Sequence, residues 1–249
     1  MKKRLDLHLH ESGLAKSRSQ AQQLIDAGLV SVDGRKITKS SFEVDPHAQI
    51  EIQDSALSRY VSRGGVKLEG ALKRTGLSVN DLTLLDIGIS TGGFTDCLLQ
   101  SGAAKVYGID VGRDQTDPKI KSDPRVLIFE GYNARDLATL RIEGPGFYDG
   151  IVIDVSFISL ELVLPPAAKR LDPKGWILAL VKPQFEAGRA SLGKNGVVKD
   201  PKTFEEVREK IYILCEQAQL GVEDYFESDI TGTDGNREFF ILARPRSHR

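Results

Sequence analysis

The feature that most constrains the fold is an alternation of short apolar runs with helix-like segments after about residue 80. Seven runs are predicted to be strands: 82–87, 105–109, 126–129, 151–154, 176–181, 222–227 and 238–243. Candidate helices fill most of the gaps, notably 92–101, 160–171 and 203–219. Strands and helices that alternate in this way predict an open, doubly wound α/β sheet.

Polar residues stand at the ends of these predicted strands. Asp86, Asp110, Asp154 and Lys182 each end or directly follow one of the runs. Ligands of open α/β sheets bind beyond the carboxyl ends of the strands. We therefore expect these side chains to face one site.

The turn after the first predicted strand indicates the kind of ligand. It reads Asp86-Ile87-Gly88-Ile89-Ser90-Thr91-Gly92-Gly93, where glycines let the backbone approach an adenosine-type molecule closely. Asp110 follows 24 residues after Asp86, in a position to accept hydrogen bonds from ribose hydroxyls. On its own this pattern fits either NAD or S-adenosylmethionine.

The N-terminal segment has a different organisation. A leucine-rich helical stretch precedes a second helix that Ser17 is placed to cap and Gly28 to end. Asp33-Gly34 predicts the tight turn of a hairpin. Residues 1–41 carry eight Lys or Arg side chains and four Asp or Glu, a modest basic surplus that suits phosphate contacts.

Composition narrows the class of protein further. With 249 residues, 40% hydrophobic and 28% charged, the chain suits one main globular domain and a small one. The two cysteines, Cys97 and Cys215, lie far apart and suggest a reducing, cytosolic compartment. The basic start is not followed by an apolar run, and no stretch approaches the roughly 18 apolar residues of a membrane span. The four histidines lack ligand spacing, so no metal site is expected.

Within roughly residues 2–53 the chain resembles the S4 RNA-binding domain. The resemblance rests on Arg4-Leu5-Asp6, 12–18, Ala21, Leu24-Ile25, 28–30 and 32–34. It implies a small α+β domain that binds structured RNA through basic side chains. The residues expected to contact RNA are Arg4, Lys16, Arg18, Arg35 and Lys36. We expect this domain over 1–58, a linker over 59–66 and a second domain over 67–249.

Nearly the whole chain resembles the TlyA/haemolysin A family. The motifs are 86–95, 153–160, Leu180-Val181-Lys182-Pro183-Gln184-Phe185-Glu186 and 235–240. The resemblance implies an S4 domain joined to an FtsJ-like, Rossmann-like methyltransferase sheet. It also implies S-adenosylmethionine-dependent 2′-O-methylation of cytidine in ribosomal RNA, with ribosomal RNA or ribosomal subunits as partners and a cytoplasmic location.

The family's Lys-Asp-Lys-Glu tetrad matches Lys67, Asp154, Lys182 and Glu238. For the cofactor we expect contacts from the turn and the strand ends, with Asn133 or Asp136 reaching the adenine. The expected cofactor residues are Asp86, Gly88, Ser90, Gly92, Asp110 and Asn133. Two departures from the family pattern concern this pocket: Ile89 stands where a small residue is expected, and Arg113-Asp114 replaces Tyr-Gly.

The proposed chemistry needs alignment and removal of a proton, because a ribose hydroxyl is a poor nucleophile. Lys182 is the candidate that meets the 2′-hydroxyl, as a neutral amine acting as base or as an ammonium that stabilises the developing oxyanion. Asp154 would orient Lys182, Lys67 would supply a neighbouring charge, and Glu238 would hold a lysine. Ser156, Phe157 and Ser159 would shape the target-nucleotide pocket or serve packing and capping. The segment 188–196 would be a substrate-facing or an ordinary surface loop.

Ordinary structural roles compete with each assignment. Asp154 could cap a helix near Ser159, Lys182 could be a solvated strand end, and Glu238 could pair with neighbours of Arg237. Two other functions also fit parts of the sequence: a non-catalytic RNA-binding or ribosome-assembly factor and, less favoured, a haemolysin acting on membranes.

Overall fold

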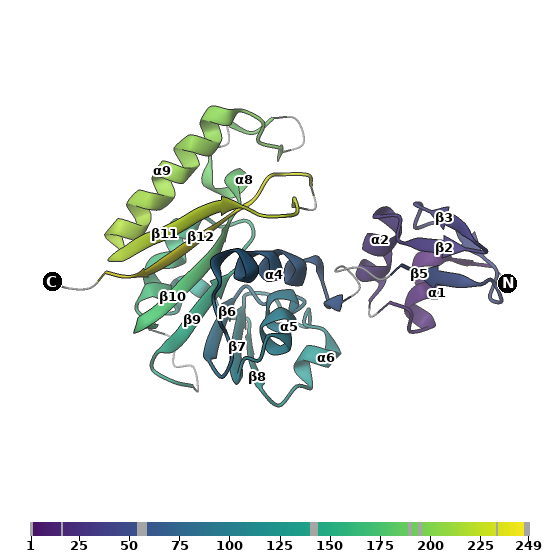
Figure 1. Cartoon of the computed structure of the whole chain (residues 1–249), viewed down its shortest axis with the longest axis horizontal. Coiled ribbons are helices and arrows are strands. Elements are labelled where there is room, and N and C mark those ends of the chain that lie inside the picture. The colour runs from purple at the N-terminus through teal and green to yellow at the C-terminus, as the bar shows by residue number, and fades with distance from the viewer. Residues whose placement is uncertain are drawn as a thin grey trace. The chain divides into compact units, whose positions relative to one another are not determined.

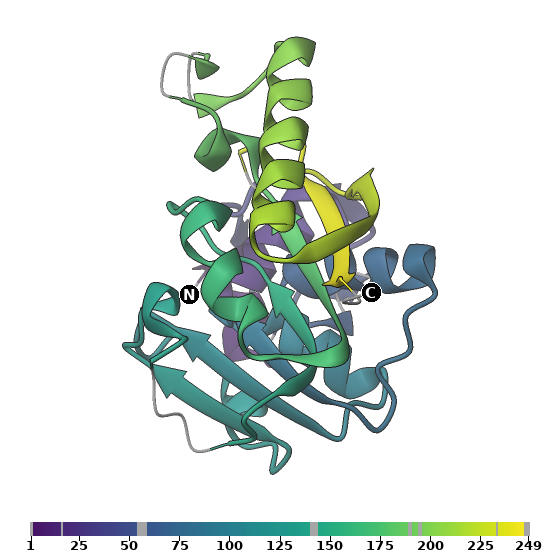
Figure 2. The ribbon, with the colours of Figure 1, turned by 90° about the vertical axis from the view of Figure 1, so that its left-hand side faces the viewer.

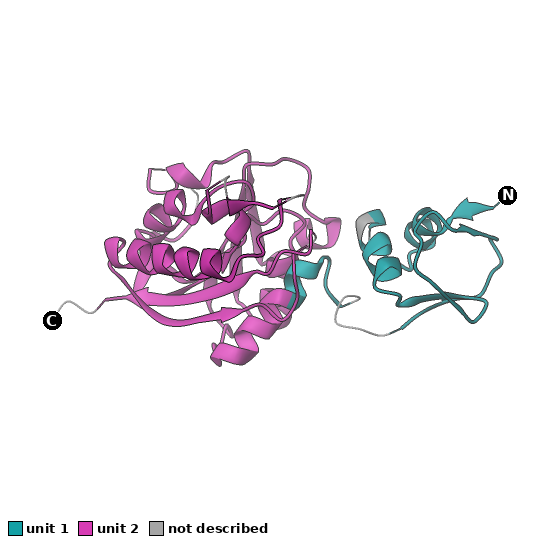
Figure 3. Cartoon of the chain, turned by 90° about the horizontal axis from the view of Figure 1, so that it is seen from above, with its two compact units in different colours: residues 1–66 teal, residues 67–249 magenta. Residues whose placement is uncertain are grey.

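The computed structural model describes residues 2–15, 17–53, 59–139, 144–188, 191–193, 196–232 and 234–246. The chain divides into two compact units, Met1–Val66 and Lys67–Arg249 (Figure 3). Each unit has a hydrophobic core of its own.

The first unit is a small α+β fold. Helices α1 (Leu5–Glu11) and α2 (Arg18–Asp26) share a core with strands β2 (Val30–Val32), β3 (Arg35–Ile37) and β5 (Ile50–Ile52). These strands form an antiparallel sheet in the order β3-β2-β5, and β1 (Lys3–Arg4) pairs separately with β4 (Glu43–Val44).

Single residues determine where helix α2 begins and where the hairpin between β2 and β3 turns. The Ser17 hydroxyl caps α2 by accepting a hydrogen bond from the Gln20 amide at 3.1 Å. Asp33 and Gly34 have φ of 49° and 76°, the left-handed conformations that a two-residue hairpin turn requires. The predicted cap and hairpin are both confirmed.

The second unit is built on one seven-stranded sheet, in the order β11-β12-β10-β9-β6-β7-β8 (Figure 1). Each of the seven predicted strands is present. Their bounds are β6 (Thr83–Ile87), β7 (Lys105–Asp110), β8 (Val126–Glu130), β9 (Tyr148–Ile153), β10 (Leu171–Val181), β11 (Leu220–Glu227) and β12 (Phe239–Pro245). The helical elements are α4 (Arg63–Thr75), α5 (Gly93–Gln100), α6 (Pro118–Lys121), η1 (Ala134–Asp136), η2 (Leu160–Leu162), α7 (Leu164–Ala168), α8 (Pro183–Glu186) and α9 (Pro201–Gln217).

Helices cover both faces of this sheet (Figures 1 and 2). Alternate strand residues such as Leu85 and Ile87 pack in one core with Leu164 of α7 and Ile211 of α9. Asp86, between them, points to the other face and meets α5. This period of two is the alternation expected of strands buried on both faces.

One strand runs against the others. β12 is antiparallel to both β10 and β11, whereas β10-β9, β9-β6, β6-β7 and β7-β8 are parallel pairs. The first residues of β12 therefore lie at the edge where the parallel strands end. Helix α4 begins at Arg63, so the last residues of the expected linker 59–66 are helical.

Candidate active site

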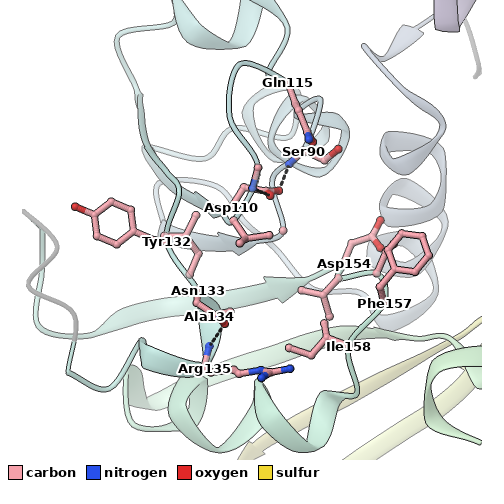
Figure 4. A pocket seen from close by; sticks show the side chains of 16 residues that line it. Ser90, Asp110, Gln115, Tyr132, Asn133, Ala134, Arg135, Asp154, Phe157 and Ile158 are labelled. Carbon is pink, nitrogen blue, oxygen red and sulfur yellow. Dashed lines mark hydrogen bonds between the residues drawn. The ribbon is translucent and has the colours of Figure 1, made fainter.

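A cavity of about 580 Å³ opens at the carboxyl ends of β6, β7 and β9. Figure 4 shows Ser90, Asp110, Asn133 and Asp154 around it, each from a different strand end or loop. Gly88 lines the same cavity. Its size falls within the range of pockets that enclose small ligands.

The Asp110 carboxylate is held in place by backbone amides. Ser90 N donates to Oδ2 at 2.8 Å, and Gly112 N donates to Oδ1 at 2.7 Å. A carboxylate oxygen accepts more than one hydrogen bond, so Asp110 keeps the capacity to bind hydroxyl donors of a ligand. Asp110 stands at the end of β7, where the sequence predicted a carboxylate that accepts hydrogen bonds from ribose hydroxyls.

Gly88 is required by a close approach of two loops. Its φ is +86°, and a Cβ atom there would lie 2.3 Å from the backbone carbonyl oxygen of Asp154. The Asp154 amide also donates to the Ile87 carbonyl at 2.9 Å. The glycine therefore lets the loop that carries Asp154 close against the turn after β6.

The structure accommodates both departures from the family pattern. Ile89 is 3% exposed, and its side chain fills the space beside Gly108, where a Cβ would lie 2.3 Å from Ile89 Cδ1. Asp114 has φ of 56°, a left-handed conformation that Asp adopts more readily than most non-glycine residues. Asp114 thus takes a backbone conformation that the usual glycine would adopt easily.

Two residues predicted to bind the cofactor lie beneath the turn and do not line the cavity. Asp86 is fully buried and accepts a hydrogen bond from Thr95 Oγ1 at 2.6 Å. Burial raises the pKa of Asp86 to about 7, and the nearby charges of Asp154 and Asp110 act in the same direction. Gly92, with φ of +92°, packs so closely on Ile120 that a Cβ would lie 2.9 Å away.

Asp154 and Lys182 form an ion pair at the edge of the cavity. Lys182 Nζ lies 2.6 Å from Asp154 Oδ1 and donates to Ser156 Oγ at 2.9 Å. The Lys182 side chain is only 11% exposed, which does not fit a solvated strand end. Ser159, not Asp154, caps the following 3₁₀ helix by accepting a hydrogen bond from the Glu161 amide.

Lys67 and Glu238 form the second pair. The ammonium of Lys67 donates to Glu238 Oε2, and the two side chains are 10% and 4% exposed. Glu238 therefore pairs with a lysine of α4 and not with neighbours of Arg237, the alternative that the sequence left open.

Strand register brings the two pairs to neighbouring positions. Val181 of β10 pairs with Phe239 of β12, so Lys182 and Glu238 are the next residues along these antiparallel strands. Residues opposite each other in such a pair have Cα atoms about 4.5–5.5 Å apart. The four predicted catalytic residues thus form two adjacent ion pairs at one edge.

Three apolar side chains line the cavity: Val111 and Tyr132 were not predicted from the sequence, whereas Phe157 was expected to shape the target-nucleotide pocket or to serve packing. Val111 and Tyr132 bring apolar surface to the cavity and are 71% and 38% exposed. Phe157 is 90% exposed and has φ of 63°, an unusual backbone conformation for an aromatic residue. The feature that marks Val111 and Tyr132 is an exposed apolar side chain beside a cavity, and the exposure of a side chain cannot be read from the sequence.

Glu186 connects the loops that follow β9 and β10. Its buried carboxylate accepts hydrogen bonds from Ser159 Oγ at 2.6 Å, from the Leu160 amide at 2.7 Å and from Lys210 Nζ at 3.1 Å. Asn133 lines the cavity while its side-chain oxygen caps η1 through the Arg135 amide at 3.1 Å. Of the expected loop 188–196, residues 189–190 and 194–195 lie outside the described residues.

Four of the five residues predicted to contact RNA have described positions in the first unit. Arg4 and Arg18 both bind Asp6 and are 42% and 49% exposed at the side chain. Arg35 and Lys36 follow the hairpin turn on β3, and Lys36 extends along Gly28, where a Cβ would lie 2.1 Å from Lys36 Cε. Lys16 lies outside the described residues.

Comparison with known proteins agrees with this architecture. A family model of the FtsJ-like methyltransferase matches residues 60–244, and one of the S4 domain matches residues 3–50. The fold and the site thus define an FtsJ-like methyltransferase that carries an S4 domain.

Individual relatives show which family of FtsJ-like methyltransferases the chain is similar to. A Bacillus subtilis protein named "Putative rRNA methyltransferase YqxC" is 44% identical over 96% of this chain and 85% of its own length. The Mycobacterium tuberculosis protein named 16S/23S rRNA (cytidine-2′-O)-methyltransferase TlyA is 39% identical over 99% of this chain and 91% of its own. A solved structure of a "putative hemolysin" from Streptococcus thermophilus has a TM-score of 0.77 at 40% identity and covers 99% of this chain and 89% of its own. The chain belongs to the TlyA/haemolysin A family.

Two kinds of feature, metal clusters and membrane-spanning helices, are not found among the described residues. Among the residues with described positions, no group of three or more His, Cys, Asp or Glu side chains is arranged to hold a metal ion. No described helix combines the length and the apolar character needed to cross a bilayer.

Proposed function

We propose that this chain is an S-adenosylmethionine-dependent methyltransferase that modifies the ribose 2′-hydroxyl of a cytidine in ribosomal RNA. The observation that carries the proposal is the Asp154–Lys182 pair at the edge of a ligand-sized cavity. The family membership and the TlyA relative's named activity support the substrate class. The S4 domain supports an RNA partner.

The residues around the cavity fit this cofactor. Three carboxylates, Asp86, Asp110 and Asp154, lie close enough that Asp110 and Asp154 both raise the pKa of Asp86. Of these three, Asp110 lines the cavity and is held by backbone amides, so its negative charge suits hydroxyl donors of the cofactor and opposes the pyrophosphate of NAD. S-adenosylmethionine, when bound, would supply a methyl group already activated for transfer.

The residues that line the cavity each have a proposed role in binding the cofactor. Asp110 would accept hydrogen bonds from the ribose, and the Asn133 amide group would donate to the adenine. Val111 and Tyr132 would pack against the adenine faces, because both present apolar surface to the cavity. Gly88 and Ser90 would approach through their backbone, while Asp86 and Gly92 would shape the turn from below.

Lys182 would act on the 2′-hydroxyl. Its ammonium is oriented by Asp154 and Ser156, so Nζ has a fixed position at the cavity edge. In one role the neutral amine removes the proton; in the other the ammonium stabilises the oxyanion as the proton leaves to water. Lys67, held by Glu238, would add positive charge beside the reacting oxygen. Phe157 would offer its exposed ring to the target base.

Methyl transfer from labelled S-adenosylmethionine to ribosomal RNA tests the proposal. Naked RNA and ribosomal subunits would be offered separately, and the product digested to nucleosides. We expect 2′-O-methylcytidine. Binding of RNA and cofactor without transfer to either substrate would favour a non-catalytic assembly factor, and transfer to a base would refute the ribose assignment.

The wider organisation follows from this function. We propose an RNA-binding domain over 1–58, a linker over 59–66 and a catalytic domain over 67–249. A ribosomal substrate supports a cytoplasmic location. Arg4, Lys16, Arg18, Arg35 and Lys36 would contact the RNA backbone.

A further inference from the structure

Asp6 is a fully buried carboxylate in a unit whose proposed partner is a polyanion. It belongs to the first turn of α1 and has no exposed surface. Burying a charge is costly unless donors surround it. Asp6 therefore needs an explanation in terms of what it binds.

Five donors converge on this carboxylate. Oδ1 accepts from Arg4 Nε and from the Leu7 amide, both at 3.0 Å. Oδ2 accepts from Arg4 Nη2 at 3.0 Å, Arg18 Nε at 2.9 Å and Gln22 Nε2 at 3.0 Å. These hydrogen bonds, that of Arg4 first, hold the pKa of Asp6 well below its usual range.

The arrangement brings two cations together at the surface. Arg4 precedes α1 and Arg18 begins α2, so the guanidinium groups come from different elements and would repel each other without the carboxylate. Their side chains remain 42% and 49% exposed although the carboxylate they share is buried. Arg4 uses Nε and Nη2 for Asp6 and Arg18 uses Nε, so Nη1 of Arg4 and both Nη atoms of Arg18 take no part in these hydrogen bonds. Guanidinium edges of this kind match phosphate oxygens.

We propose that Asp6 is a positioning residue for RNA binding: it fixes Arg4 and Arg18 as one rigid phosphate-binding pair. The inference rests on the proposed function, since it takes RNA as the partner of this unit. Asp6 itself would not touch RNA. Its contribution is to order two long side chains before binding, so that binding does not have to order them.

A positioning role for Asp6 predicts a change in RNA affinity that is opposite in sign to the change expected from net charge alone. Asp6→Asn removes one negative charge, so the net charge of the domain rises by one, and it keeps the shape of the side chain. If only net charge mattered, RNA would bind more tightly. If Asp6 positions the arginines, RNA binds more weakly, by about tenfold, because two side chains must then be ordered on binding.

Glu11→Gln is the matched control. Glu11 lies on the same helix, pairs with Lys3 at 2.6 Å and is 53% exposed, so its substitution adds the same charge without touching Arg4 or Arg18. The full chain would be titrated with ribosomal RNA transcripts over a range of salt concentrations. We expect Glu11→Gln to bind as tightly as wild type or more tightly, and Asp6→Asn to bind about tenfold more weakly.

The salt dependence separates positioning from unfolding. Asp6→Asn keeps the phosphate contacts of Arg4 and Arg18 and should leave the slope of log K against log salt close to that of wild type, whereas an unfolded domain would lose its whole contribution to the slope, about 0.7–0.9 for each phosphate contact. Arg4→Lys provides a second variant that keeps the charge but cannot bind Asp6 through two nitrogens, and it should weaken binding likewise. Binding by Asp6→Asn or Arg4→Lys that equals that of Glu11→Gln would overturn the inference. Failure of the wild-type chain to bind RNA in a salt-sensitive way would instead overturn the proposed function.

Discussion

The buried Lys67–Glu238 pair gives a prediction with a definite magnitude. Both side chains are at most 10% exposed, so neither charge can turn to solvent when its partner is removed. Replacing Glu238 with Gln leaves the Lys67 ammonium buried and uncompensated. Removing one member of such a pair costs about 3–5 kcal/mol of the free energy of unfolding.

Urea unfolding followed by tryptophan fluorescence measures this cost. Trp176 is the single tryptophan of the chain, lies in β10 and is 4% exposed, so its emission reports on the catalytic unit. The exposed pair Arg237–Glu227 supplies a control, because both side chains are more than 40% exposed. Glu227→Gln should cost less than about 1 kcal/mol.

A double-mutant cycle tests the reasoning itself. Lys67→Met and Glu238→Gln should each destabilise the unit, and the double variant should lose clearly less than the sum of the two, because no unpaired charge remains. Additive losses would mean that the two residues do not stabilise each other. In that case the account of the pair given above is wrong.

Further predictions concern the turn after β6. Because the pKa of Asp86 rises from 3.8 to about 7 on folding, the native state holds a proton that the unfolded chain has lost; stability from this group is fully present below pH 4 and lost as the pH rises through 7. Asp86→Asn should remove this loss, at most about 4 kcal/mol, as seen in urea titrations between pH 4 and 8. Gly88→Ala places a methyl group 2.3 Å from the Asp154 carbonyl and should weaken S-adenosylmethionine binding at least tenfold by calorimetry, with strain of about 1–3 kcal/mol. Gly146→Ala, where nothing lies within 4 Å, should bind normally; equal affinities for the two variants would contradict the steric argument.

The fold was largely predictable because its strands are continuous apolar runs and its turns carry specific residues. Ser17, Asp33 and Gly34 determine a cap and a hairpin by local chemistry, so their roles could be read directly. The reversed direction of β12 could not, because an apolar run such as 239–243 has no direction. That reversal explains why Glu238 precedes its strand whereas Lys182 follows one, although both lie at the same edge.

The side-chain pairings within the candidate site could not be predicted from the sequence. Sequence indicated four polar positions but not that Lys182 pairs with Asp154 and Lys67 with Glu238, since the four positions are widely separated in the chain. Gly88 was expected to admit a ligand, and the structure adds that it admits the Asp154 carbonyl. The positions of Val111, Tyr132 and Phe157 depend on loop conformations that pattern alone does not determine.

Methyl transfer by Lys182→Ala tests the central claim most directly. The rate of transfer to ribosomal RNA would be measured together with S-adenosylmethionine affinity and RNA affinity. Lys174→Ala is the control, because Lys174 lies within β10, eight residues before Lys182, which directly follows that strand. The account predicts a loss of at least about 100-fold in turnover for Lys182→Ala, with both affinities retained and Lys174→Ala unaffected. Near-normal turnover by Lys182→Ala would contradict it.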